Sequence, residues 1–205
     1  EEIRVQLAGI SLYNYGIYIN ECNNIFLHNI NVATPLVSGI SANKNVCLYL
    51  KNSYQNILLN NIILSATNTA SNQNLGISFY NSSSKIINFA INIAGSSINN
   101  VSVLTSNDQL YQSQTYNEFF SGVLSSQDAI DYSIYNNSYS TVIMNGSEIN
   151  GPVYNSPISS SINCTACFTT NPTGAGIGTG YQSISSRGEN EQAQGTLTLG
   201  DTAGA

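Results

Sequence analysis

The residue types able to do chemistry in this chain are few, and the cysteines are the most distinctive of them. Cys164 and Cys167 form a Cys-x-x-Cys motif, whereas Cys22 and Cys47 lie far away in the sequence. A redox motif needs a helix N-terminus to lower the thiol pKa, but this pair lies among residues typical of strands and turns. Zinc needs a second pair at a matching spacing. We therefore expect a structural disulfide, and the sequence leaves open whether it closes locally or reaches Cys22 and Cys47.

The first half of the chain has few residues that could act as a general acid or base. Hydrolysis of a glycoside needs two carboxyl groups about 5–9.5 Å apart. The acids before residue 105 are Glu1, Glu2 and Glu21, and Glu21 has no acidic neighbour one repeat away. His28 is the only histidine, and without a nearby acid it is expected to be a surface or ladder residue rather than a general base. We predict no catalytic residue, no metal site and no cofactor, and hence no enzyme.

One close acidic pair, Asp128 and Asp131, lies further along the chain. With backbone oxygens it could hold calcium, but a solvated turn is the preferred interpretation. The 13 tyrosines could form a strip on which sugars stack, although they are spread through the sequence and tyrosine is common on polar β-surfaces.

Charge and hydrophobicity argue against a nucleic acid partner and against a membrane-spanning helix. Charged residues make up 8% of the chain, against about 25% in a typical protein, and the net charge is −6. The five cations are too scattered for a phosphate-binding surface, so we expect no nucleic acid partner. No apolar run reaches the roughly 20 residues that a membrane-spanning helix needs.

The elements that must position these residues are predicted by an internal repeat. Similar segments occur at Gly16–Val32, Val46–Leu64 and Leu75–Ile93, with a period near 30 residues that is typical of solenoids. Inside each segment apolar residues fall at every second position, which is the period of a β-strand. Polar turns rich in Asn and Ser separate the apolar stretches. The sequence therefore predicts short strands that stack coil upon coil at about 4.8 Å.

Asparagines recur at fixed places in the first two segments: Asn24 matches Asn56, and Asn29 matches Asn61. Together with the alternating strands, they resemble the Asn-rich repeats of right-handed parallel β-helix proteins of the pectin-lyase-like superfamily, particularly the NosD type. The resemblance implies that these four residues stack in ladders inside the turns, where Asn tolerates a left-handed backbone. The start-of-helix cap of that family is missing and the chain begins without Met, so we expect a processed or partial chain.

The expected fold class is all-β, a right-handed parallel β-helix with a less regular β-rich C-terminal part. Residues 1–104 are assigned to the coils, and 105–168 to a capping or irregular continuation in which 105–131 is one amphipathic helix or an irregular coil. Residues 169–205 are assigned to a Gly/Thr/Ser-rich tail. A candidate docking strand for a neighbouring subunit lies within this tail: Thr196, Leu197, Thr198 and Leu199. The third repeat is degraded, because Asn88 falls where Leu59 belongs unless the register slips by one.

Three functions follow as expectations, in order of preference. The first is a non-catalytic structural subunit of a filament, sheath or fibre, in which copies of the chain associate; low charge suits close packing of like subunits. The second is a glycan-binding or adhesin module, which requires aromatic residues aligned on one face over successive coils. The third and weakest is a carbohydrate-active lyase or hydrolase. An even number of cysteines and the scarcity of lysine favour an extracellular, cell-surface or virion-surface location.

Overall fold

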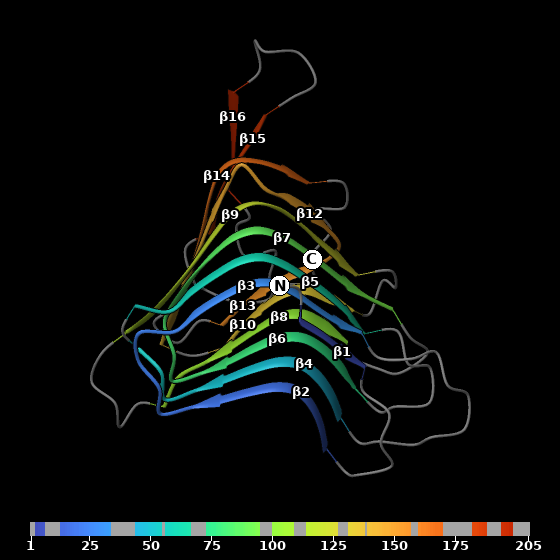
Figure 1. Cartoon of the computed structure of the whole chain (residues 1–205). Coiled ribbons are helices and arrows are strands. Elements are labelled where there is room, and N and C mark those ends of the chain that lie inside the picture. Colours follow the sequence, from blue (N-terminus) through green and yellow to red (C-terminus); the bar gives the residue numbers. More distant parts are fainter. Residues whose placement is uncertain are drawn as a thin grey trace.

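The chain is known from a computed structural model, which describes residues 3–6, 13–33, 44–54, 56–66, 73–94, 100–108, 114–126, 131–137, 139–156, 160–169, 182–187 and 194–198. Every regular element within these ranges is a β-strand, and the strands form two sheets. Figure 1 shows β2, β4, β6 and β8 side by side in one curved layer and β3, β5 and β7 in the other. Nowhere in the described ranges is there a helix with the length and apolar character needed to cross a bilayer.

The first sheet has ten strands in the order β1, β3, β5, β7, β9, β11, β14, β15, β16, and β12 pairs with β9 and β14 beside this path. Its strands are β1 Ile3–Gln6, β3 Phe26–Ala33, β5 Leu58–Ala66, β7 Ser84–Ile93, β9 Thr115–Ser126, β11 Ser140–Asn145, β12 Glu148–Asn150, β14 Ser161–Thr169, β15 Gln182–Arg187 and β16 Gln194–Thr198. All their pairings are parallel except that of β15 with β16.

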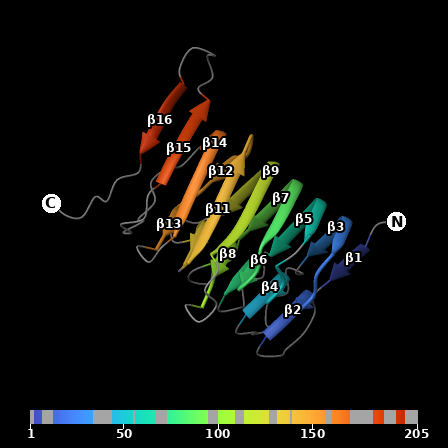
Figure 2. The same cartoon turned by 90° about the vertical axis from the view of Figure 1, so that its left-hand side faces the viewer.

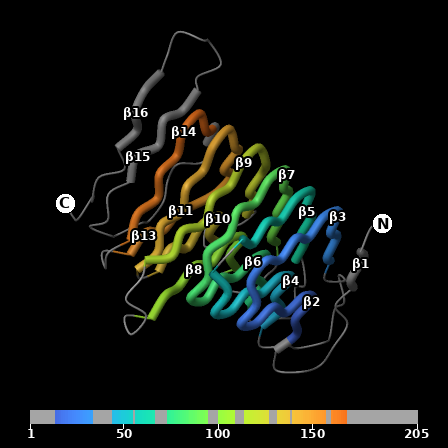
Figure 3. The backbone as a smooth tube through the Cα atoms, turned by 60° about the vertical axis from the view of Figure 1, so that its left-hand side comes forward, coloured from blue at the N-terminus to red at the C-terminus, as the bar shows by residue number. Residues whose placement is uncertain are grey.

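The second sheet has six parallel strands in the order β13, β10, β8, β6, β4, β2. Its strands are β2 Tyr13–Asn20, β4 Lys44–Lys51, β6 Asn74–Tyr80, β8 Val101–Ser106, β10 Tyr132–Asn136 and β13 Val153–Asn155. From β2 to β11 the chain alternates between the sheets and advances by one strand each time, as the tube in Figure 3 and the side view in Figure 2 show. The protein is a parallel β-helix, as the repeat predicts.

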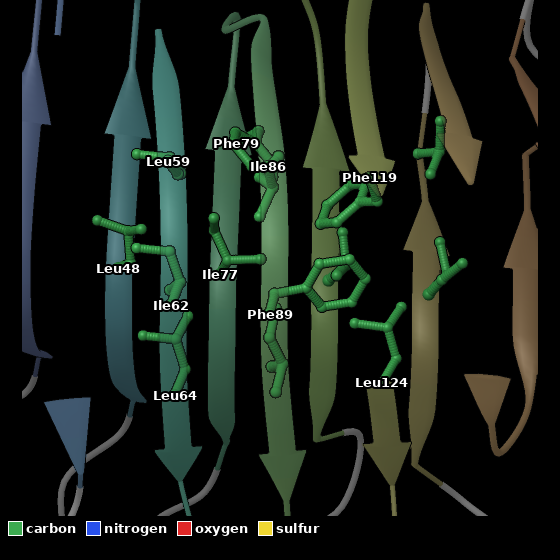
Figure 4. Packing of buried hydrophobic residues seen from close by; sticks show 14 of the residues in the cluster. Leu48, Leu59, Ile62, Leu64, Ile77, Phe79, Ile86, Phe89, Phe119 and Leu124 are labelled. Carbon is green, nitrogen blue, oxygen red and sulfur yellow. The ribbon is translucent and has the colours of Figure 1, made fainter. Parts of the chain in front are cut away.

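The core lies between the two sheets, because the apolar residue of each alternating pair points inward. Figure 4 shows these side chains from both sheets meeting along the axis of the coils. Phe119 is fully buried and makes edge-to-face contacts with Phe79 and Phe89, with ring centroids 6.3 and 5.3 Å apart. Burying a side chain of this size stabilises the fold by about 1.5–3 kcal/mol. The aromatic cluster therefore anchors the middle of the solenoid.

The coils continue further than the sequence predicts. Strand β8 crosses the expected boundary at residue 104, and residues 115–126 form the long strand β9 in the first sheet. The prediction of a helix or irregular coil there is wrong, because β9 alternates buried and exposed residues and pairs with β7 and β11.

The third repeat is shorter than the second rather than degraded. Ile86 pairs with Leu59, and Ile62 pairs with Phe89, so Asn88 falls beside Asn61. The expected mismatch of Asn88 with Leu59 is therefore wrong. Asn88 also shares the left-handed backbone of Asn61, with φ of 52° and 56°, so the bend keeps its place in each coil while the preceding turn varies in length.

The candidate docking strand overlaps β16, which pairs antiparallel with β15 of the same chain. Thr196, Leu197 and Thr198 lie in β16, and Leu199 lies outside the described residues. One edge of this strand is thus occupied within the chain.

Candidate functional site

The four asparagines assigned to ladders are hydrogen-bonded in the expected pairs. Asn56 Nδ2 donates to Asn24 Oδ1 at 2.7 Å, and Asn61 Nδ2 donates to Asn29 Oδ1 at 2.6 Å. All four have a left-handed backbone, with φ between 54° and 58°. Three of them are exposed and Asn29 is half-buried, so these ladders run along the surface at the bends and not inside the turns.

A second, buried ladder is missed by the sequence reasoning. Asn14 Nδ2 donates to Asn45 Oδ1 at 3.0 Å, and Asn45 Nδ2 donates to Asn74 Oδ1 at 3.2 Å. Asn100 Oδ1 then accepts from the backbone N–H of Asn74 at 2.8 Å. Asp131 ends the column, because its carboxylate accepts the N–H and the Nδ2 of Asn100 at 3.0 and 3.1 Å. The signal for this ladder is an amide or acid directly before one register position of the second sheet, which is occupied by Tyr15, Val46, Leu75, Val101 and Tyr132.

Asp131 corrects the interpretation of the acidic pair. Its side chain is 0% exposed, so a solvated turn is wrong for this residue, and Asp128 lies outside the described residues. Burial of a carboxylate is costly unless hydrogen bonds satisfy it, and the two donors of Asn100 supply them. Asp131 therefore belongs to the architecture of the ladder.

The other groups considered for catalysis are separate from one another. His28 is exposed and its ring lies parallel to that of Phe26, with centroids 6.0 Å apart. Glu21 is exposed at a turn whose equivalents in the next two coils are Asn52 and Asn81, as the backbone hydrogen bonds between coils indicate. Within the described ranges, no three His, Cys, Asp or Glu side chains gather as a metal site would require.

None of the four cysteines is joined in a disulfide in this structure, whereas the sequence predicts one. Cys47 lies in the core, and burial raises its pKa to about 12. Cys164 and Cys167 are both buried near the end of the core and share a hydrogen bond between their thiols. The motif is therefore a buried dithiol.

The outer face of the six-stranded sheet, here called the tyrosine face, gathers tyrosines that are far apart in the sequence. Tyr15, Tyr18 and Tyr49 form one cluster on β2 and β4, with ring centroids 5.4 to 5.5 Å apart. A second cluster lies on β10 and β13 at the other end of the sheet. Its members are Tyr132, Tyr135 and Tyr154, with centroids 4.4 to 6.2 Å apart.

An apolar strip joins the two clusters across the strands between them. Val46, Leu75 and Val101 stand in one column of the sheet and are buried by their neighbours, although they face outward. Two shallow grooves flank the strip. One, of about 250 Å³, is lined by Tyr15, Lys44, Val46, Tyr49, Leu75, Ser78, Phe79, Tyr80, Leu104 and Ser106. The other, of about 380 Å³, is lined by Gln73, Val101, Leu104, Tyr132 and Tyr135.

Two phenols of this face, those of Tyr49 and Tyr135, have a raised pKa and are held in their neutral form. Burial, together with the nearby phenols of Tyr15, Tyr18 and Tyr80, raises the pKa of Tyr49 to about 12. Burial also raises the pKa of Tyr135. A neutral phenol both donates and accepts a hydrogen bond, so the face presents flat rings together with hydroxyl groups of both functions.

A third and larger groove, of about 650 Å³, crosses the outside of the first sheet near the bends. Its walls include Phe26 and Tyr116, which are 61% and 49% exposed. Lys85 and Glu118, neighbours across β7 and β9, line the same groove. The ammonium of Lys85 lies over the ring of Phe120, 4.7 Å from its centroid.

No protein-family model, curated protein or solved structure matches the chain, so its function has to be argued from these surfaces.

Proposed function

We propose that the chain is a glycan-binding module whose ligand lies on the tyrosine face. The observation that carries the proposal is that one outer face holds a tyrosine cluster at each end of the six-stranded sheet. Tyr15, Tyr18 and Tyr49 form one cluster, and Tyr132, Tyr135 and Tyr154 form the other. An aromatic ring offers a large, rigid apolar surface and, in tyrosine, a polar edge. A sugar ring matches both, because its C–H groups stack on the aromatic face while its hydroxyls bond to the phenols.

The spacing of the clusters sets the length of the ligand. Strands β4 and β10 are three steps apart in the sheet, and each step is about 4.8 Å, so the clusters are separated by about 14 Å along the axis. A single sugar cannot contact both clusters. The proposed ligand is therefore an oligosaccharide that lies across the strands, and its affinity should rise with chain length until both clusters are covered.

Charge favours a neutral or weakly charged glycan. Among the residues that the structure describes, Lys44 is the only cation lining the two grooves of this face. Tyr80 donates a hydrogen bond to the carboxylate of Asp108 beside it. A highly sulfated or phosphorylated chain would need a denser set of cations. Stacking and neutral hydrogen bonds therefore carry the binding.

The proposal is tested by titrating the protein with neutral oligosaccharides of increasing length and measuring binding by calorimetry. Tyr49→Ala and Tyr135→Ala should each weaken binding of a hexasaccharide by about 2- to 12-fold, from the 0.5–1.5 kcal/mol of an aromatic contact. The matched control is Tyr116→Ala, which removes an exposed tyrosine from the opposite sheet. Equal losses in all three variants, or no binding by any oligosaccharide on a broad glycan array, would refute the proposal.

A second candidate is a structural subunit of an extracellular or virion-surface assembly, built from copies of the chain. It is supported by β2, the last strand of the six-stranded sheet, which pairs on one side only within the described residues. Such an edge is a template for another strand. Electron microscopy of undissociated material and light scattering over a range of concentrations test it. Ordered polymers would favour this candidate, and a monomer at every concentration would exclude it.

A further inference from the structure

The Cys-x-x-Cys motif lies on an irregularity of β14 that turns both thiols to the same side. In a regular strand, residues three apart point to opposite faces. Here Cys164 pairs with Ile184 and Cys167 pairs with Ser186, so β14 holds two residues where β15 holds one. The extra residue is accommodated by Ala166, whose φ of 51° is left-handed. As a result Thr165 and Ala166 face solvent while both cysteines enter the core.

The two thiols are in contact and are chemically unequal. They share a hydrogen bond, which lowers the pKa of Cys167 and, together with burial, raises that of Cys164. Burial opposes this effect by raising the pKa of Cys167, and backbone hydrogen bonds with Ser147 and Thr165 lower it. The Sγ of Cys167 also donates a hydrogen bond to the carbonyl oxygen of Thr165 at 3.5 Å. The shared hydrogen bond therefore favours the thiolate on Cys167 and the thiol on Cys164.

The remaining cysteines differ from this pair in a way that makes them controls. Cys47 is fully buried in β4 and forms no thiol contact with Cys164 or Cys167. Cys22 is half-buried at a turn, where its Sγ donates to the carbonyl oxygen of Asn20 at 3.1 Å. Exposure alone would make Cys22 the most readily oxidised of the four.

We propose that Cys164 and Cys167 are a modification site for hydroperoxides, at which two thiols close to a disulfide across the β14 bulge. The Cys167 thiolate attacks one oxygen of hydrogen peroxide; an S–O bond forms, the O–O bond breaks and hydroxide leaves. Cys164 then attacks the sulfur of the Cys167 sulfenic acid, so that an S–S bond forms and the S–O bond breaks. The protons of the two thiols convert both hydroxides to water. Two thiols are thus oxidised by two electrons, and one peroxide is reduced to two waters.

The experiment exposes the full chain to graded hydrogen peroxide, alkylates the remaining thiols in denaturant and locates cross-links by peptide mass spectrometry. The expected product is a Cys164–Cys167 disulfide, lighter than the dithiol by about 2 Da and restored by a reductant. Cys22→Ser with Cys47→Ala should leave its yield unchanged. Because mapping also works on the unsubstituted chain, the result does not depend on the folding of any variant.

The order of reaction is tested in that double variant. Cys164→Ser should accumulate a sulfenic acid on Cys167 that dimedone traps, whereas Cys167→Ser should react at least tenfold more slowly. Circular dichroism verifies that each variant keeps its strands. The proposal is overturned if both thiols remain fully alkylated under peroxide that oxidises Cys22, or if Cys167→Ser reacts as fast as Cys164→Ser.

Discussion

Replacing Asn45 by alanine is the sharpest test of the buried ladder. Asn45 is 2% exposed and holds one bond on each side, from Asn14 at 3.0 Å and to Asn74 at 3.2 Å. Each neutral hydrogen bond contributes about 1 kcal/mol, and a buried polar partner that loses its bond costs about 1–3 kcal/mol. The fully buried Asn74 is such a partner. The lost bond with Asn14 accounts for about 1 kcal/mol and the lost bond of Asn74 for about 1–3 kcal/mol. We therefore expect the free energy of unfolding to fall by about 2–4 kcal/mol.

The matched control is Asn56→Gly in the exposed ladder. Asn56 donates an even shorter bond, 2.7 Å to Asn24, but water can replace it there. Glycine keeps the left-handed φ of 54° without strain. A surface change of this kind should cost less than about 1 kcal/mol.

Both variants are measured by equilibrium urea unfolding followed by far-ultraviolet circular dichroism, because the chain has no tryptophan. The urea midpoints of the variants are compared on the condition that the slope of the unfolding free energy against urea concentration is the same for each, because only then does a shifted midpoint report a change in stability. If Asn45→Ala lowers the free energy of unfolding no more than Asn56→Gly does, burial does not determine how much a ladder hydrogen bond contributes to stability, and the reasoning is wrong.

Three further predictions concern the core and the tyrosine face. Phe119→Ala should lower the free energy of unfolding by about 3–5 kcal/mol, since Phe119 is fully buried against Phe79 and Phe89; urea unfolding measures it, and a loss below 1 kcal/mol would contradict the packing. Gly122→Ala should cost about 1–3 kcal/mol, because an added Cβ would clash with the carbonyl oxygen of Phe89; an unchanged thermal midpoint would argue against this close approach. Stability should also fall as pH rises from about 10, where an unfolded tyrosine loses its proton, to about 12, where folded Tyr49 does, because the folded state binds more protons in that window. Tyr49→Phe should flatten this decline in the urea midpoint, and an unchanged slope would refute the assignment.

The parts of the fold that follow from local periodicity could be predicted from the sequence. Alternating apolar residues and the recurrence of Asn24 as Asn56 indicate stacked coils, and the structure has both. The sequence predicts too early an end for the regular coils, because β9 has Ser121 at the bend where the earlier coils have Asn. Serine, unlike asparagine, does not indicate a left-handed backbone, so the sequence gives no sign of this bend.

The tyrosine face could not be located from the sequence, because it depends on register between coils. Tyr18 pairs with Tyr49, but the next positions in that column are Ser78 and Leu104 before Tyr135. The residue type at this position changes from one coil to the next, so a repeated tyrosine in the sequence does not reveal the tyrosine face. The buried dithiol was hidden for a similar reason, since a one-residue bulge decides whether two cysteines three apart can meet.

The buried ladder has a consequence for how the chain is made. Its steps join residues 26 to 31 positions apart, whichever coil is considered. Closing a loop of that length costs about 3 kcal/mol plus a constant, and the cost does not grow as coils are added. Each finished coil also presents an edge on which the next can pair. At about 5–20 residues per second, a ribosome releases one coil every few seconds, so the solenoid can assemble in the order of its synthesis without waiting for its C-terminal end.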